Sequence, residues 1–426
     1  MRIILFFLFS SCCVASLIAQ DELSIEQCLE LVSKNEKRFA NQTSAIQAAN
    51  LDQKFNNWSL LPNLSLSPNY NVSFGRKLDP FTNTFGVNTV YSNSYSLQYQ
   101  LPIFQGFKYF RSKKMYASII ENSTLVKTTT IENAKQQMLD KYFEVLKIQV
   151  KLNNQDQVIE QLKLFKARQI ELVKEGRLSA IDTLETSVNE KNQKMTLLSL
   201  NNQLKSETIR INYLLGLPLI QETKIKQEIE EGIIKVELDE YYQLLALQQQ
   251  KEVSLLQQKV QNSQLFPSLS TYGNIGTGFS TNNLDYTQES LPVIRYDHQI
   301  QNNLYSGIGV SLNLPIFNQG AMLKNQKLSD INQKQLDQNI LDQQQLLEQR
   351  KLEIEQQQYF LKQQLEIQKM IVSDKESLTS IYESLYLEGK IRITEFEKIK
   401  NDYLMYQNSI QEIELDMLRL SIYKVE

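Results

Sequence analysis

The chain is poor in the residues from which enzymes and metal proteins build their sites. Its 426 residues include one histidine, His298, and three cysteines. One histidine excludes a multi-histidine metal centre within the chain and disfavours a Ser/His/Asp triad. Three cysteines exclude a disulfide framework and a Cys-rich zinc site. With 45 Lys+Arg against 48 Asp+Glu, the net charge of -3 provides no general attraction for nucleic acid. The composition therefore argues against most enzymes, against a cofactor or metal, and against a nucleic-acid partner.

Glycine and proline, which interrupt helices, are also scarce, with 13 and 8 residues. Residues 107–175 and 322–388 contain neither of them. Two stretches of about 68 residues predict rods of roughly 100 Å. Shorter helices are predicted over residues 24–59, 179–216, 238–265 and 394–423. The last has apolar residues at steps of three and four, which indicates packing against other helices: Phe396, Ile399, Tyr403, Tyr406, Ile410, Ile413, Met417 and Leu420.

The first 19 residues have the pattern of a secretory signal peptide. Arg2 precedes an apolar run over residues 3–9, and small residues lead to Ala19, where cleavage is expected. The alternatives are lipid attachment at Cys12 and an uncleaved membrane anchor. Cleavage at Ala19 leaves Cys28 as the one remaining cysteine. Beyond residue 20, no apolar run reaches the ~18 residues of a spanning helix, so an exported chain that crosses a membrane must do so as strands.

The two halves of the chain resemble each other at three places, in the same order. The sequence LPNLSLSPNYNVSFG at 61–75 corresponds to FPSLSTYGNIGTGFS at 266–280, LPIFQG at 101–106 to LPIFNQG at 314–320, and LVKEGRLSAIDTL at 172–184 to LYLEGKIRITEFE at 385–397. A repeat of about 200 residues is too long for a solenoid unit. We therefore expect a duplicated domain, with a first repeat at 20–215, a linker at 216–236 and a second repeat at 237–426.

Each repeat contains two segments in which apolar and polar residues alternate. At 64–74, Leu64, Leu66 and Tyr70 lie on one parity, and Ser65 and Asn69 lie on the other. Similar segments occur at 91–101, 269–279 and 304–314. Such alternation predicts strands with one apolar and one polar face. The polar parity carries Ser, Asn, Gln and Gly, a composition that suits a water-filled lumen.

The length of these strands favours a membrane-spanning sheet. Tilted transmembrane strands need about 9–11 residues, whereas strands of soluble sheets average about 5–6. A soluble β-sandwich is the alternative. Four strands are too few for a barrel, because the smallest bacterial outer-membrane barrels have about eight. If three chains pool their strands, twelve strands close around an open lumen, which predicts an oligomer for a conducting protein.

These features together resemble the TolC family of outer-membrane efflux proteins over nearly all of the mature chain. The resemblance rests on the duplicated helix–strand–strand–helix order, the two LPIF strand exits, YLLGLPL at 213–219, and the paired glycine turns. It implies an α+β membrane protein. In this family a homotrimer forms a 12-stranded β-barrel in outer-membrane lipid and an antiparallel coiled-coil α-barrel in the periplasm. A periplasmic adaptor and an inner-membrane pump are the implied partners.

The resemblance also implies roles for the two glycine turns. In the family, periplasmic tips that contact the adaptor are helix–helix turns centred on a glycine, which permits positive φ. The corresponding residues here are Gly176 with Arg177 and Leu178, and Gly389 with Lys390 and Ile391.

The carboxylates that close the tunnel in family members map to the segment after the second turn. Glu395 occupies the first carboxylate position, and Lys398 replaces the second. Tyr386 matches a tyrosine of the links between helices, and Asp182 matches an acidic position after the first glycine. Ile391 stands where the family has an arginine, and Arg392 follows it.

The resulting prediction is a passive exit duct, gated at its periplasmic tip and driven by a partner pump, because the chain has no nucleotide-binding loop. It would serve a tripartite efflux or type I secretion system. A secreted coiled-coil scaffold or adhesin is the alternative. That alternative explains the rods but does not explain four strands of membrane length in two matched pairs.

Overall fold

The computed structural model describes residues 22–75, 77–78, 83, 85–86, 89–176, 179–227, 235–285, 287–290, 292–318 and 320–424. The predicted signal peptide at 1–19, Cys12, Arg177 and Leu178 lie outside these residues. The chain divides into two compact units, and each unit combines segments from both predicted repeats. One unit consists of Ser44–Thr124 and Ala246–Ile340. The other consists of Met1–Thr43, Leu125–Leu245 and Leu341–Glu426.

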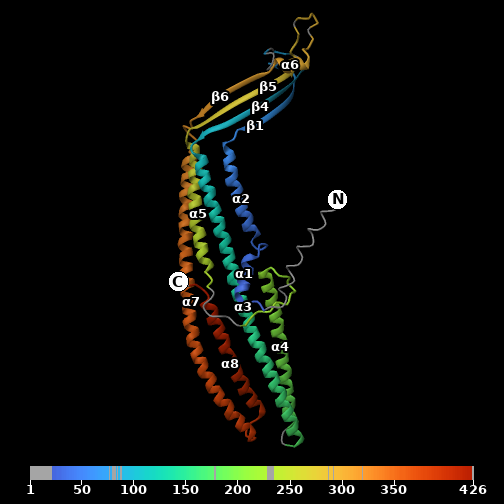
Figure 1. The fold of residues 1–426 in the computed structure, drawn as a ribbon, viewed down its shortest axis with the longest axis vertical. Coiled ribbons are helices and arrows are strands. Elements are labelled where there is room, and N and C mark those ends of the chain that lie inside the picture. The colour runs from blue at the N-terminus through green and yellow to red at the C-terminus, as the bar shows by residue number, and fades with distance from the viewer. Residues whose placement is uncertain are drawn as a thin grey trace, which may run out of the picture. The chain divides into compact units, whose positions relative to one another are not determined.

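A four-stranded antiparallel sheet dominates the first of these units (Figure 1). Its strands are β1 (Asn63–Ser73), β4 (Val90–Gln105), β5 (Ser268–Ser280) and β6 (Tyr305–Asn313), in the order β1-β4-β5-β6. Each of the four predicted strands is confirmed. The end of β4 differs from the prediction, because the strand continues past Pro102 to Gln105. A bulge between Pro102 and Phe104 accommodates the proline, which cannot donate a ladder hydrogen bond.

The register of the sheet confirms the predicted separation of its faces. Leu66 pairs with Leu97 and Leu64 with Tyr99, whereas Ser65 pairs with Gln98 and Ser67 with Ser96. Opposite residues share a face, so one face is apolar and the other is polar and uncharged. The apolar side chains are exposed, with Leu66 67% accessible to solvent. An exposed apolar face that extends over all four strands indicates an environment other than water.

The segments between paired strands contain small elements of their own. A two-stranded hairpin, β2 (Lys77–Leu78) with β3 (Phe85–Gly86), lies between β1 and β4. Helix α6 (Tyr296–Asn302) lies between β5 and β6. Its Gln299 accepts from the N–H of Ser280 and donates to the carbonyl of Ser280, and Asn303 donates to the carbonyl of Gly278. These contacts cap the part of β5 that extends beyond β6.

Long helices make up most of the rest of the described chain. Helix α3 (Lys108–Lys174) and helix α7 (Ala321–Leu387) are continuous over 67 residues each, as predicted. The shorter helices are α4 (Ala180–Leu215), α5 (Asp239–Gln261) and α8 (Ile393–Ser421). Short 3₁₀ turns, η1 (Asn57–Leu60) and η2 (Asn262–Leu265), precede β1 and β5. No described helix is long and apolar enough to span a bilayer.

The first predicted helix is in fact two helices, α1 (Ile25–Lys34) and α2 (Ala40–Asn56). The chain turns between them because tertiary contacts stabilise the break. Asn35 donates its side-chain amide to the carbonyl of Leu214, and Phe39 is buried. A helical pattern in sequence cannot reveal such contacts.

The core of the second unit forms around the middle of α3. Met138, Leu139, Tyr142 and Phe143 are buried there, packed with residues of α1 and α4. The Tyr142 hydroxyl donates to the carbonyl of Lys226 over 2.6 Å. Val236 and Tyr423 form a parallel bridge in the same unit. These contacts join the linker and the chain ends to the centre of α3.

Cys28 of α1 is fully buried in this core, and burial raises the pKa of its thiol to about 12. Because the thiolate is the reactive form, we expect no reaction with a maleimide in the native mature protein. We expect complete labelling after unfolding in guanidinium chloride, measured by mass spectrometry. Rapid labelling of the native protein would contradict the packing of α1 against α3.

Candidate functional site

The two predicted glycine turns lie at the same end of the unit that contains the α3–α4 and α7–α8 hairpins (Figure 1). Gly176 has φ 72° and Gly389 has φ 71°. A Cβ added at either glycine would meet nothing within 4 Å. The left-handed backbone, rather than lack of space, therefore requires glycine. At Gly389, two bonds of 2.9 Å, Gly389 N to Tyr386 O and Lys390 N to Leu385 O, form a Schellman motif.

Each turn leads into a helix with an acidic residue in its first turn, which suits the positive end of the helix dipole. In α4 this residue is Asp182, after the N-cap Ser179. In α8 it is Glu395, after the N-cap Arg392. Both Glu395 and Arg392 have exposed side chains. Lys390 forms an exposed ion pair with Glu388, 2.6 Å long.

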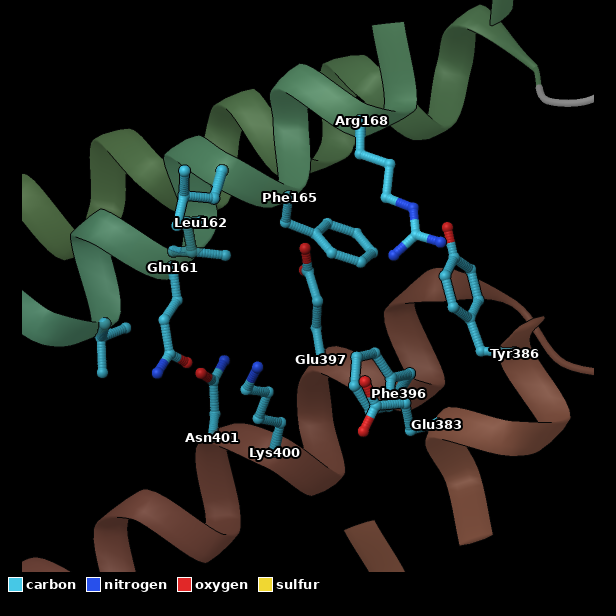
Figure 2. Close-up of a pocket in the computed structure, with 12 residues that line it drawn as sticks. Gln161, Leu162, Phe165, Arg168, Glu383, Tyr386, Phe396, Glu397, Lys400 and Asn401 are labelled. Carbon is cyan, nitrogen blue, oxygen red and sulfur yellow. The ribbon is translucent and has the colours of Figure 1, made fainter. Parts of the chain in front are cut away.

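Three aromatic rings join α3 to the α7–α8 hairpin near these turns. Tyr386 of α7 stacks on Phe396 of α8, with 5.7 Å between ring centroids and 8° between planes. Phe165 of α3 lies 5.6 Å from Tyr386 and 6.3 Å from Phe396. Burial raises the pKa of Tyr386, with Arg168 opposing the shift and Asp182 and Glu397 adding to it. Figure 2 shows the Arg168 side chain pointing toward the Tyr386 ring.

A carboxylate beside these rings connects α8 to α4. Glu397 accepts a hydrogen bond from Thr186 Oγ1 over 3.2 Å and from Asn189 Nδ2 over 3.3 Å. Burial raises the pKa of Glu397, the two hydrogen bonds oppose that shift, and Glu185 adds to it. We call Glu397, Thr186 and Asn189 the Glu397 latch.

The latch continues into a chain of amide side chains that reaches α3. Asn189 accepts from Gln193 over 3.3 Å, and Gln193 accepts from Gln155 over 2.7 Å. A further link between α3 and α4 is made by Lys166, which donates to Ser187 and forms an ion pair with Glu190. The hairpin tips are therefore held together by oriented hydrogen bonds as well as by aromatic packing.

A cavity of about 260 Å³ lies between α3 and the α7–α8 hairpin (Figure 2). The aromatic rings form part of its wall. Figure 2 shows Glu397 pointing from α8 toward Phe165. Lys400 lies above the Phe396 ring, 5.7 Å from its centroid. The cavity is lined by apolar side chains and by charged side chains of both signs. It lies where α3 contacts the α7–α8 hairpin.

The structure brings together some of the predicted site residues and leaves others apart. The structure places Tyr386 in the aromatic cluster at the tip and Asp182 in the first turn of α4. Glu395 and Arg392 lie next to it but point into solvent in the single chain. Glu397 was missed by sequence reasoning. The available signal was its place beside Phe396, because a carboxylate next to the buried stripe of a helix requires a polar partner.

Comparison with known proteins agrees with this architecture. Residues 233–421 match the family model described as "Outer membrane efflux protein". No curated protein sequence gives a significant match. Among solved structures, the outer membrane protein VceC from Vibrio cholerae has a TM-score of 0.71 at 11% identity, covering 94% of this chain and 97% of VceC. The CmeC outer membrane channel of Campylobacter jejuni has a TM-score of 0.72 at 14% identity, covering 93% and 84%. The open-state MtrE channel of Neisseria gonorrhoeae has a TM-score of 0.65 at 12% identity, covering 94% and 89%.

The fold is that of these outer-membrane proteins. Residues 233–421, less than half of the chain, thus resemble the outer membrane efflux proteins, and the fold of the solved outer-membrane channels extends over nearly the whole chain. The resemblance to the TolC family is thereby confirmed. The match gives no support to a secreted scaffold or adhesin.

Proposed function

We propose that three copies of this chain assemble into a channel whose pooled sheets form a twelve-stranded barrel in the outer membrane. The observation that supports this proposal is that each of the two edge strands, β1 and β6, pairs with only one neighbour in the described sheet. In the described sheet, β1 pairs with β4 alone and β6 with β5 alone. Each outer edge therefore presents unpaired backbone groups, which cost several kcal/mol each in lipid. Pairing of β1 with β6 of another copy satisfies them, and three copies leave an open lumen.

The polar face of the sheet then lines the lumen and the apolar face meets lipid. The lumen wall of Ser, Asn, Gln and Gly carries no fixed charge on the four strands. Such a wall favours passage of varied solutes rather than strong selection. The energy for export comes from an inner-membrane pump, which is reached through a periplasmic adaptor. This arrangement makes the chain the exit duct of a tripartite efflux or type I secretion system.

The adaptor contacts are proposed at the two turns, Gly176 with Arg177 and Leu178, and Gly389 with Lys390 and Ile391. Support comes from the position of both turns at one end of the same unit (Figure 1). Gly176 and Gly389 both have left-handed backbone conformations, and both are exposed, as is Lys390.

The gate is proposed at the same end, with Asp182, Tyr386, Arg392 and Glu395 around the constriction. Threefold symmetry places three copies of Glu395 around one axis. Three carboxylates in proximity attract cations. We therefore expect a narrow, cation-selective closed channel.

The experiment that tests this function is the conductance of purified protein in planar lipid bilayers. Small, cation-selective conductance steps are expected for the native channel. Glu395→Gln is expected to reduce cation selectivity and leave the number of insertion events unchanged. Absence of any conductance would contradict the channel, whereas unchanged selectivity in Glu395→Gln would contradict only the proposed ring.

A further inference from the structure

The helix ends next to the sheet carry positive charge and no carboxylate. The sequence contains no Asp or Glu at residues 53–78, 80–120, 253–284 or 298–329, which include all four long strands and the adjoining helix ends. The same helix ends contain several basic residues: Lys54, Lys108, Arg111, Lys113, Lys114, Lys259, Lys324 and Lys327. In a chain with slightly more acidic than basic residues, this distribution defines a basic band beside the sheet.

Helix stability does not account for the part of this band at the starts of α3 and α7. Helices α1, α4, α5 and α8 have acidic residues in their first turns, as the helix dipole favours. Helices α3 and α7, which follow β4 and β6, have none there. They begin instead with lysines such as Lys108 and Lys324, which the dipole disfavours. At the starts of α3 and α7 the positive charge is therefore placed against the preference of the helices and needs a different explanation, whereas Lys54 and Lys259 lie in the last turns of α2 and α5, where the dipole favours them.

One exposed face of α3 combines this charge with aromatic surface. Phe110, Lys113 and Lys114 stand at steps of three and four and share a face. The Phe110 ring is 67% exposed. The neighbouring faces of α3 are covered, because Tyr109 donates to Asn57 over 2.9 Å and Arg111 to Ser263 Oγ over 3.2 Å. We call Phe110, Lys113 and Lys114, with the exposed Phe107 that precedes α3, the basic–aromatic face.

We propose that the basic–aromatic face binds anionic phospholipid headgroups in the periplasmic leaflet of the outer membrane. The charge is complementary to lipid phosphates, and the face begins where a strand of the membrane sheet ends. Aromatic side chains are enriched at membrane–water interfaces, and lysine stems extend toward the headgroups while their ammonium groups stay in water. The contact fixes the depth of the sheet in the bilayer. It goes beyond export but rests on the sheet being in the membrane.

The fluorescence of a native tryptophan can be used to detect this lipid contact. Trp58, the single tryptophan, is exposed and follows Asn57, the residue that accepts from Tyr109 of α3. The full mature protein is reconstituted into phosphatidylcholine vesicles that contain either brominated phosphatidylglycerol or brominated phosphatidylcholine. Quenching of Trp58 fluorescence then compares the two lipids beside α3. We expect stronger quenching by the anionic lipid, and we expect the difference to decrease as salt screens the charges.

The decisive variant removes two charges from the face, with Lys113→Gln and Lys114→Gln combined. Because each lysine near an anionic membrane contributes about a fivefold preference, the double variant is expected to lose roughly 25-fold of the lipid selectivity. The matched control is Lys163→Gln with Lys174→Gln. It makes the same charge change at exposed positions of the same helix, outside the sheet unit. The control is expected to keep the native preference.

Two outcomes would overturn the proposal. One is equal quenching by the two lipids in the native protein, and the other is an unchanged preference in the Lys113/Lys114 variant. Bilayer conductance of the same preparations separates this failure from failure of the channel itself. A conducting protein without lipid preference refutes the lipid contact alone. Native mass spectrometry of retained phosphatidylglycerol gives a second measurement that does not depend on Trp58.

Discussion

Leu66→Lys is expected to prevent stable insertion into the outer membrane, whereas the same substitution at the next residue, Ser67→Lys, is expected to be tolerated. Leu66 lies near the middle of β1 on the apolar face, paired with Leu97. A lysine facing lipid at the bilayer midplane costs about 2–4 kcal/mol per chain, and a trimer carries three copies. Ser67 lies on the polar face, where a charge meets water and changes ion selectivity instead.

The measurement is the fraction of each variant that remains in the detergent-extracted outer-membrane fraction, together with its bilayer conductance. We expect a large loss of membrane-bound protein for Leu66→Lys. Ser67→Lys is expected to insert normally and to shift selectivity toward anions. Because the two sites are adjacent and the substituted residue is the same, general effects on expression are matched. Equal insertion of the two variants would contradict the assignment of the faces.

Glu397→Ala is expected to open the channel, and Glu397→Gln is expected to keep it closed. Alanine removes both bonds of the Glu397 latch and separates α8 from α4 at the tip. A loss of about 2 kcal/mol from hydrogen bonds to a charged group corresponds to a roughly 30-fold larger open population. Glutamine retains a carbonyl that accepts from Thr186 or Asn189. Single-channel recordings measure the open probability of each variant directly.

The latch also predicts how conductance responds to pH. Burial raises the pKa of Glu397 in the latched arrangement above its ordinary value. The latched state therefore binds the proton more tightly than an open state with a solvated carboxyl. Acidification favours the latch, and a rise in pH through the raised pKa weakens it. We expect conductance to fall on acidification, in the window between the raised pKa and the ordinary value of about 4.3.

The variants separate this effect from the negative charge of Glu395. Glu397→Gln is expected to lose the acid-induced closure that belongs to the latch. The matched control, Glu395→Ala, changes an exposed carboxylate on the same helix. It is expected to alter cation selectivity while the latch-dependent part of the pH profile remains. An unchanged pH profile in Glu397→Gln, or a closed Glu397→Ala channel, would show that the latch does not control the gate.

Much of the architecture could be predicted from sequence because the period of the apolar residues is a local property. Alternation at 64–74 placed Leu66 and Ser67 on opposite faces, as the register of β1 shows. The absence of glycine and proline predicted two helices that are continuous over 67 residues. Few alternative structures are open to a segment that lacks glycine and proline or whose apolar residues recur at a regular spacing.

The remaining features depend on contacts between residues far apart in the chain. The break between α1 and α2 depends on Asn35 and Leu214, which are separated by 179 positions. The Glu397 latch joins α8 to residues more than 200 positions earlier. Spacing within α8 identifies the stripe that contains Phe396. It does not show which neighbour of that stripe faces α4, and the resemblance to the TolC family pointed to Glu395 rather than Glu397.

The central claim is that one chain supplies one third of a membrane barrel. The most direct test is the mass of the detergent-extracted complex, measured by light scattering with the detergent contribution subtracted. We expect a complex that is extracted only with detergent and has three times the mass of the mature chain. A water-soluble monomer or dimer would contradict pairing of β1 with β6 between copies, and with it the channel.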